Sequence, residues 1–387
     1  MLRRPAGWTA TLALALLVPL LDTRPLRAAD ADASAYRLEA TLLLIGDTGA
    51  PKPGEPVLSV LEREASRVPE STTVVFLGDN VYPRGIPPDG DKDRPEAERR
   101  LFQQLDAVRR SGARGVLVPG NHDWDLGAGA GWDAVKRQEA LVAKAAGPRV
   151  SLLPGGGCPG PAILDLSPRL RLVLLDTQWW FQKGPKPRHP SSACECDSEG
   201  ELAVQLRVAL SSAGGRHVVV AAHHPLVSGG PHGGRYGWKE HLFPLRFVND
   251  KLWVPLPGVG SLYVLYRTRG VRDDDMASKP YSALISLVEG AIAGSPRPLA
   301  WASGHDHSLQ VIEGASGGPR WYLVSGGGYA GGETPVRALP ESRFARSAPG
   351  ILRLRVFASG RAELTAITAE TPAGTEAFTT VLSPGPP

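Results

Sequence analysis

Residues 41–49 are TLLLIGDTG and residues 73–82 are TVVFLGDNVY. In both stretches a short apolar run ends at a Gly-Asp pair, and runs of this length bounded by turn residues are typical of buried strands. Further runs lie at 115–118, 170–175, 217–221, 299–302, 320–324 and 351–356. They alternate with helical patterns at 56–67, 95–110, 132–146 and 199–212. The alternation predicts an α/β protein whose sheets are covered by helices.

Polar segments follow five of the predicted strands. They are Gly46-Asp47-Thr48-Gly49, Gly78-Asp79-Asn80-Val81-Tyr82, Gly120-Asn121-His122-Asp123, Ala222-His223-His224-Pro225 and Gly304-His305-Asp306-His307. Taken alone, Asp47 would suit a helix cap and Tyr82 ordinary packing. Ligands of α/β proteins collect beyond the carboxyl ends of strands, however, so we expect these side chains to converge.

The converging side chains have the chemistry of a metal site. Carboxylate and imidazole groups together suit Fe, Mn or Zn, whereas a calcium site requires oxygen ligands almost exclusively and a thiolate zinc site requires cysteine. The spacing of His305 and His307 also fits, because period two in extended backbone sends both side chains to one side. The sequence therefore predicts a transition-metal site.

The five segments together resemble the calcineurin-like metallophosphoesterase superfamily, and within it the small, tartrate-resistant type of purple acid phosphatase. Two features indicate this branch: Gly49 stands where the wider superfamily has histidine, and Tyr82 follows Asp79 by three residues. The resemblance implies a four-layer α/β/β/α sandwich of two mixed sheets flanked by helices. We expect it to occupy residues 36–370.

The resemblance also implies a centre of Fe(III) and a divalent ion, which would be Fe, Zn or Mn. The implied ligands are Asp47, Tyr82 and His307 for the ferric ion, Asp79 as the bridge, and Asn121, His223 and His305 for the divalent ion. Two further residues are predicted to be catalytic. His122 would contact substrate or protonate the leaving group, and His232 would assist from a glycine-rich loop, where an ordinary loop role is the alternative.

The predicted activity is hydrolysis of phosphate monoesters by attack of a metal-bound hydroxide. The two metals carry more positive charge than Asp47, Asp79 and Tyr82 neutralise, so the site attracts phosphate, and the metals lower the pKa of bound water. A phosphodiesterase or nucleotidase using the same centre is the alternative. A secreted binding protein without catalysis is less well supported, because no ligand is missing.

The N-terminal residues predict export. Arg3 and Arg4 precede an uncharged stretch at 8–21, and Ala28 and Ala29 follow, which is typical of a signal peptide over 1–29. We therefore expect a secreted or periplasmic protein without a stable membrane span after cleavage. The formal net charge of +4 identifies no partner. We expect a small phosphorylated substrate and no nucleic acid, and the sequence leaves the oligomeric state open.

Three other features of the sequence remain. Cys158 could pair with Cys194 or Cys196 in an exported protein, whereas the last two are badly placed to pair with each other. Residues 233–298 interrupt the alternation of strands and helices, which predicts an insertion near the active site, with an ordinary excursion as the alternative. Residues 371–387 are small and polar, which predicts a flexible tail.

Overall fold

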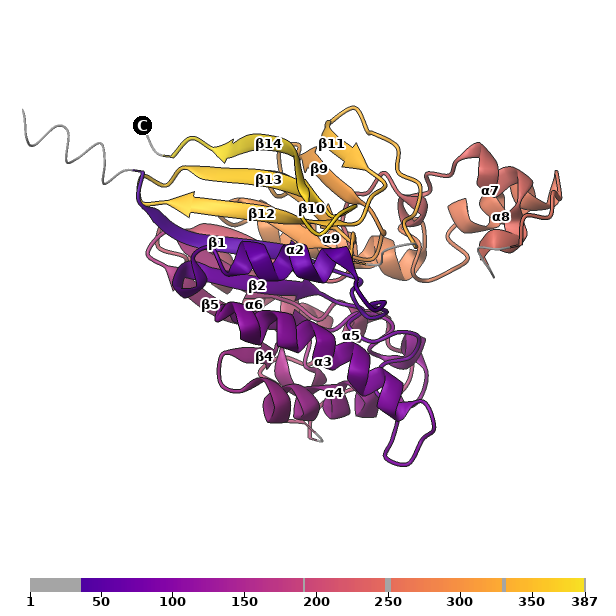
Figure 1. Ribbon diagram of the computed structural model, residues 1–387, viewed down its shortest axis with the longest axis horizontal. Coiled ribbons are helices and arrows are strands. Elements are labelled where there is room, and N and C mark those ends of the chain that lie inside the picture. Colours follow the sequence, from indigo (N-terminus) through magenta and orange to yellow (C-terminus); the bar gives the residue numbers. More distant parts are fainter. Residues whose placement is uncertain (1–35, 191, 248–251, 329–331, 386–387) are drawn as a thin grey trace, which may run out of the picture.

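The structure is a computed structural model that describes residues 36–190, 192–247, 252–328 and 332–385 (Figure 1). The signal peptide expected at 1–29 lies outside these ranges. Within them, no helix combines the length and the apolar character needed to cross a membrane.

The first sheet contains the N-terminal and C-terminal strands. Its members are β1 (Leu38–Ile45), β2 (Thr72–Leu77), β3 (Arg114–Val118), β4 (Val150–Leu152), β12 (Gly350–Phe357), β13 (Ala362–Thr368) and β14 (Thr375–Ser383). These seven strands lie in the order β14-β13-β12-β1-β2-β3-β4. The strands β1 to β4 run parallel, and β12, β13 and β14 add an antiparallel half.

The second sheet is built from the middle of the chain. Its members are β5 (Ala162–Ser167), β6 (Leu170–Leu174), β7 (His217–Ala221), β8 (Ala300–Ser303), β9 (Leu309–Glu313), β10 (Trp321–Ser325) and β11 (Ser342–Arg346). The order is β11-β9-β10-β8-β7-β6-β5. The central strands β6, β7, β8 and β10 are parallel, and antiparallel strands close both edges.

Helices cover the outer faces of both sheets. The helices are α2 (Pro56–Ala65), α3 (Arg94–Ser111), α4 (Gly131–Ala146), α5 (Gln178–Phe181), α6 (Glu199–Ser211), α7 (Trp238–Leu242), α8 (Val259–Thr268) and α9 (Lys279–Ala293). Short 3-10 turns are η1 (Pro69–Ser71), η2 (Asp125–Gly127), η3 (Gly155–Gly157), η4 (Pro231–Gly233) and η5 (Pro244–Phe247). The helices α2, α3 and α4 pack on the first sheet, and α6 and α9 pack on the second.

The side chains of β1 show how the layers form. Leu42 and Leu44 enter the apolar core between the two sheets, whereas Leu43 and Ile45 enter the core under the helices of the first sheet. Successive residues of a strand point to opposite faces, so a strand covered on both sides reads as a continuous apolar run. Two mixed sheets between two helical layers confirm the predicted four-layer α/β/β/α class.

The expectation of a flexible tail over 371–387 is wrong for most of that segment. β14 pairs antiparallel with β13, and Leu382 lies in the core between the sheets. The strand forms the sheet edge and remains largely exposed over 375–381, so its sequence lacks the apolar run that marks the inner strands. The main-chain pairing holds it, and residues 386–387 are outside the described part.

The segment 233–298, expected as an insertion, divides into two parts. α9 packs on the second sheet beside α6 and contributes Leu284 and Val288 to the core, so this part belongs to the helical layer. The helices α7 and α8 instead stand away from the sheets (Figure 1). The residues that join α8 to α9 approach the candidate site, as described below.

One disulfide joins Cys158 to Cys194, with the Cα atoms 5.6 Å apart. It is one of the two pairings that the sequence left open. Cys196 is a buried free thiol, and burial raises its pKa to about 12. A thiol with this pKa is protonated and chemically inert at neutral pH, so Cys196 has a structural role.

Candidate metal centre

The five polar segments meet where the carboxyl ends of the two sheets face each other. Asp47, Asp79 and Asn121 follow the parallel strands β1, β2 and β3, and His223 and His305 follow β7 and β8. Hydrogen bonds tie the two sheets together here: the His305 amide donates to Asp47 Oδ2 at 2.9 Å, and His223 Nδ1 lies 2.8 Å from the Leu77 carbonyl oxygen. The site therefore forms only where the sheets pack.

One half of the cluster surrounds the Tyr82 hydroxyl. It lies 3.2 Å from Asp47 Oδ1 and 3.1 Å from His307 Nε2, and the two last atoms lie 3.5 Å apart. These three residues are the expected ferric ligands. The structure thus places a phenol, a carboxylate and an imidazole with their donor atoms close enough to bind one ion.

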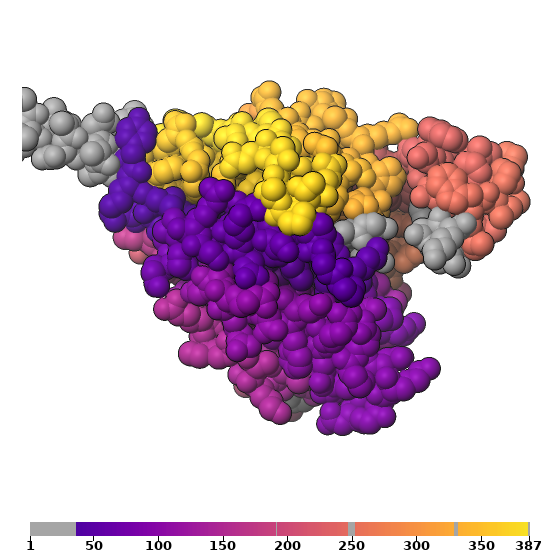
Figure 2. Space-filling view, viewed as in Figure 1, coloured from indigo at the N-terminus to yellow at the C-terminus, as the bar shows by residue number. Residues whose placement is uncertain are grey.

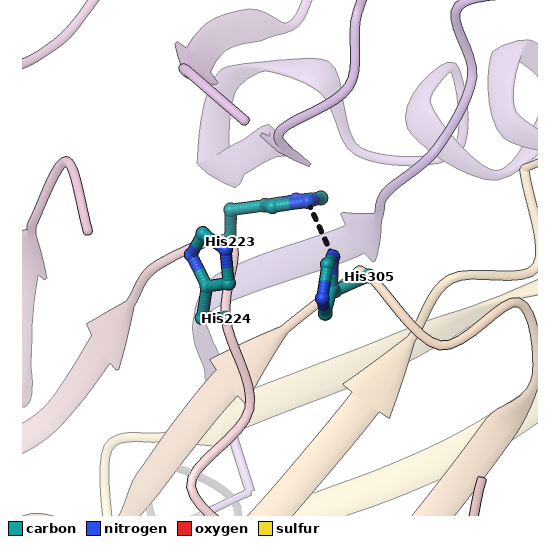
Figure 3. A group of neighbouring side chains, drawn as sticks. All are labelled: His223, His224 and His305. Atoms are coloured by element: carbon teal, nitrogen blue, oxygen red, sulfur yellow. Dashed lines mark hydrogen bonds between the residues drawn. The ribbon is translucent and has the colours of Figure 1, made fainter. Parts of the chain in front are cut away.

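The other half is centred on His223. Its Nε2 lies 2.8 Å from Asn121 Oδ1, 3.1 Å from His305 Nδ1 and 3.5 Å from Asp79 Oδ1. Figure 3 shows this contact between the ring nitrogens of His223 and His305, whose rings are nearly perpendicular, with His224 beside them. Ligand atoms of Asp47, Asp79 and His223 also lie within 4.8 Å of one another, so Asp79 stands between the two halves.

His122 lies at the open side of the cluster. Its amide donates to Asp79 Oδ1 at 2.9 Å, its Nε2 lies 3.8 Å from Asp79 Oδ2, and its ring packs against Tyr82 with centroids 4.3 Å apart. The side chain is about a quarter exposed. It is therefore within reach of a molecule bound at the cluster and of solvent.

His232 lies over the other end of the cluster. Its ring faces that of His305, with centroids 3.9 Å apart, and its Nδ1 lies 2.8 Å from the Asp274 carbonyl oxygen and 3.3 Å from Asp275 Oδ1. Arg267 of α8 donates to both carboxylate oxygens of Asp275 in a buried ion pair. The segment between α8 and α9 therefore fixes the orientation of His232.

Three of the expected ligands adopt a left-handed backbone that is unusual for residues other than glycine. The φ angles are 62° for Asp47, 54° for Asp79 and 71° for His305. Such backbone costs about 1–3 kcal/mol per residue and tends to persist at functional sites. Its occurrence at three ligand positions on two sheets indicates that the side-chain directions here are constrained.

Gly49 explains how the first two segments come together. Its amide donates to the Asp79 carbonyl, its own carbonyl accepts from the Tyr82 amide, and a Cβ at this position would lie 2.6 Å from the Asp79 carbonyl oxygen. Any side chain at position 49 would therefore separate the two loops. The glycine lets Tyr82 approach Asp47 through backbone contact.

Asp123 connects the loops of the first sheet. Its carboxylate accepts hydrogen bonds from the amides of Asn80, Val81 and Gly120 at 2.8–3.1 Å. Burial and the nearby Asp79 raise the pKa of Asp123 to about 7. These contacts show that Asp123 stabilises the turns that carry the ligands of the first sheet.

Asp306 connects the loops of the second sheet. It accepts hydrogen bonds from the Ser228 hydroxyl and the His232 amide. His224, which follows the expected ligand His223 in the sequence, is fully buried. Its Nδ1 lies 2.8 Å from the Thr177 hydroxyl, and its ring packs against Phe181. These contacts give His224 a packing role behind the ligands.

Two supporting residues escaped the sequence analysis. Asp275 reaches His232, and Arg267 holds Asp275, only because the segment between α8 and α9 folds back over the site, and no local sequence pattern predicts that approach. An acidic run at 273–275 was the one available signal.

The electrostatics of the cluster fit cations. Asp47 and Asp79 are buried, and among the described residues neither forms an ion pair with lysine or arginine. Burial acts to raise the pKa of Asp79, but the imidazoles of His223 and His122 outweigh it, so the pKa lies below its ordinary value. A buried carboxylate pair with imidazoles beside it and no lysine or arginine partner is typical of a metal site.

The protonation of the proposed histidine and tyrosine ligands differs from one residue to the next. Although burial acts to lower it, the hydrogen bond and charge of Asp47 raise the pKa of His307 to about 9, so this imidazole must lose a proton before it can bind a metal. Burial and the neighbouring imidazoles lower the pKa of His305 well below its ordinary value, which leaves a lone pair available for coordination. Burial, Asp79 and Asp47 raise the pKa of Tyr82 well above its ordinary value. Without a cation beside it, the Tyr82 side chain is therefore a neutral phenol, and a nearby cation would favour the phenolate.

Two cavities adjoin the cluster. One, of about 430 Å³, is lined by Tyr82 together with Arg84, Arg100 and Arg137. The other, of about 340 Å³, is lined by Asn121 and by Lys183, Arg272 and Asp274 among others. A substrate could therefore extend from the metal ligands in either direction.

Comparisons with known proteins agree with this architecture. The family model of calcineurin-like phosphoesterases matches residues 40–309. The chain is similar to GAP50, the anchor in the inner membrane complex of Plasmodium, with 16% identity, a TM-score of 0.54 and coverage of 90% of this chain and 89% of that one. No curated protein matches the sequence.

A second solved structure is similar as well. It is the purple acid phosphatase PPD1 from yellow lupin (Lupinus luteus) seeds, with 13% identity and a TM-score of 0.51. The alignment covers 89% of this chain and 54% of the lupin chain. At these identities the two structures establish the fold alone.

Proposed function

This chain belongs to the calcineurin-like phosphoesterase family, and on that premise we propose that it hydrolyses phosphate monoesters with a two-metal centre of the purple acid phosphatase type. The observation that carries the proposal is the convergence of Asp47, Asp79, Tyr82, Asn121, His223, His305 and His307 from loops of both sheets.

The proposed centre would be Fe(III) with a divalent Fe, Zn or Mn ion. Asp47, Tyr82 and His307 would hold the first, Asn121, His223 and His305 the second, and Asp79 both. When bound, the metals supply neutralisation of phosphate charge and a water of lowered pKa. The donor set supports this assignment, because it combines hard oxygen donors with imidazoles and contains no thiolate.

The surrounding residues supply binding and proton transfer. His122 is partly exposed and lies beside Asp79, so we assign it contact with the phosphate ester and protonation of the leaving oxygen. His232 would act from the opposite end, held by Asp275. Behind the cluster, His224 is fully buried, and burial lowers its pKa well below the ordinary value, so it is neutral there.

Export of the mature chain is part of the proposal. The basic and apolar sequence before residue 30 supports a secreted or periplasmic location, and the disulfide between Cys158 and Cys194 is consistent with an oxidising compartment. Detection of a mature N-terminus near residue 30 in the exported fraction, by mass spectrometry, would test it. An intact leader in the cytoplasmic fraction would contradict it.

The activity is testable with small chromogenic esters. The purified protein is expected to release phosphate from an aryl phosphate at acidic pH, and more slowly from a bis-aryl phosphate. A reversed preference would favour the phosphodiesterase alternative, and activity confined to nucleotides would favour a nucleotidase. The two cavities beside the cluster could serve any of these substrates, so the comparison of substrates decides.

The likeness to GAP50, described as an anchor, motivates a non-catalytic alternative. The complete ligand set argues against it, because all seven expected donors are present and their side chains converge. Metal-loaded protein without hydrolysis of any phosphate ester would support the alternative.

A further inference from the structure

Helices α7 and α8 form a lobe that projects from the body of the molecule (Figures 1 and 2). We call its described residues, 238–247 and 252–269, the projecting lobe. Its helices pack tightly: His241 Nδ1 lies 3.1 Å from the Ser261 hydroxyl, and a Cβ at Gly260 would lie 2.1 Å from the His241 carbonyl oxygen. The lobe is therefore a folded unit with its own surface.

The outer face of α8 is apolar. Val259, Leu262 and Tyr266 recur at helical spacing and are 54%, 68% and 46% exposed, whereas the buried positions include Gly260 and Val264. A surface helix normally buries its larger apolar residues and exposes polar ones. α8 does the reverse, which indicates that its outer face meets an apolar medium or partner.

Aromatic side chains continue this surface. Trp238 and Trp253 are 65% and 51% exposed, and Phe243 links them, with ring centroids 6.3 and 5.2 Å apart. Leu252 and Val254 are exposed beside Trp253. The lobe therefore exposes aromatic and aliphatic side chains on α7 and on the residues before α8, in addition to those of α8 itself.

The charged side chains of the lobe are mostly basic. Lys239, Arg246 and Arg269 form no ion pair with a carboxylate among the described residues, and the Arg246 guanidinium lies 4.1 Å from the Trp253 ring. The lobe's one acidic residue in the described part is Glu240, whose carboxylate accepts from the Gly237 amide. An apolar surface surrounded by cations complements an anionic surface that has an apolar interior.

We propose that the projecting lobe docks onto an anionic lipid membrane surface. Tryptophan and tyrosine rings favour the boundary between headgroups and acyl chains, and lysine and arginine beside them attract anionic headgroups. A second copy of this chain would present the same cations, which opposes self-association through this face. The projection also lets a planar surface reach the lobe without meeting the body (Figure 2).

Vesicle flotation tests the proposal with the full-length mature chain. The protein is expected to float with vesicles of phosphatidylcholine and phosphatidylglycerol in equal amounts, to float poorly with phosphatidylcholine alone, and to be released by high salt. Each lysine or arginine near an anionic surface strengthens vesicle binding about fivefold at low salt. Lys239→Glu/Arg269→Glu is therefore expected to weaken the affinity for the anionic vesicles by more than about tenfold.

A matched pair of variants tests the apolar face. Val259→Asp/Leu262→Asp is expected to abolish flotation, whereas Val204→Asp/Val208→Asp, at 54% and 53% exposed positions of α6, is expected to leave it unchanged. Both variants are expected to keep the melting temperature and the hydrolysis of a soluble ester.

Three results would overturn the proposal. The first is that the folded protein does not float with anionic vesicles. The second is that the α6 variant loses as much flotation as the Val259→Asp/Leu262→Asp variant. The third is that flotation survives both sets of lobe substitutions. A dimer in light scattering that Val259→Asp/Leu262→Asp dissociates, without vesicle binding, would instead assign the surface to a second copy. Since these readouts do not use hydrolysis, they are independent of the proposed enzymatic activity.

Discussion

The two sheets contribute different donor atoms to the candidate centre. The loops of the first sheet supply the oxygen donors of Asp47, Asp79, Tyr82 and Asn121, and the loops of the second supply the imidazoles of His223, His305 and His307. This division does not follow the division between the two proposed metals, because His307 lies against Tyr82. Neither sheet holds a complete set, so metal binding and the packing of the sheets are coupled.

The two sheets also support their donors differently. In the first, Asp123 binds three loop amides directly, and the support is local to the ligand loops. In the second, Asp306 and the buried pair of Arg267 and Asp275 act through residues from a distant part of the chain. The oxygen side is therefore built into the fold, whereas the histidine side depends on the segment between α8 and α9.

The largest expected effect comes from the oxygen side. Asp79→Ala removes the carboxylate between the two halves, and we expect kcat/KM for an aryl phosphate to fall by at least about a thousandfold. Steady-state kinetics with metal analysis measures it. Asp133→Ala, at an exposed position of α4, is the control and is expected to match the unmodified protein. Normal turnover by Asp79→Ala would disprove the bridging role.

A smaller effect is expected from the support of the histidine side. Asp275→Asn weakens the hold on His232 and deprives buried Arg267 of its anion, so we expect kcat to fall about 10–100-fold and the free energy of unfolding to fall by about 3–5 kcal/mol. Kinetics and thermal unfolding measure the two. Asp274→Asn is a matched control. Asp274 contacts His232 through its main-chain carbonyl oxygen, which this substitution leaves in place. Equal losses in both variants would show that His232 is not positioned by Asp275.

The last expected effect concerns stability rather than catalysis, at the junction between the sheets. Asp176 follows β6 and accepts a hydrogen bond from the indole of Trp124 at 2.8 Å, and burial raises its pKa to about 8. A carboxyl whose pKa is higher in the folded than in the unfolded state favours folding less as the pH rises, here between about 4 and 8. We expect Asp176→Asn to flatten this part of the stability profile, measured by urea unfolding across the pH range. An unchanged slope would contradict the assignment.

The inner strands and the ligand loops could be predicted because their signals are local. Each inner strand is an apolar run ending in Gly or a polar residue, as in 41–49, and the ligand types follow at once. β14 was missed because an edge strand has one exposed face and is held by main-chain pairing. The support of His232 was missed because Asp275, held by Arg267, comes into contact with it only after the chain has folded.

We propose that Tyr82 and the other donors hold a centre containing iron and a second metal. Metal analysis of the purified protein, combined with its visible spectrum and that of Tyr82→Phe, tests it most directly. We expect two metal ions per chain, at least one of them iron, and a visible absorption band that Tyr82→Phe loses. A colourless, active protein without iron would contradict the ferric assignment, and a chain that binds no metal would contradict the centre itself.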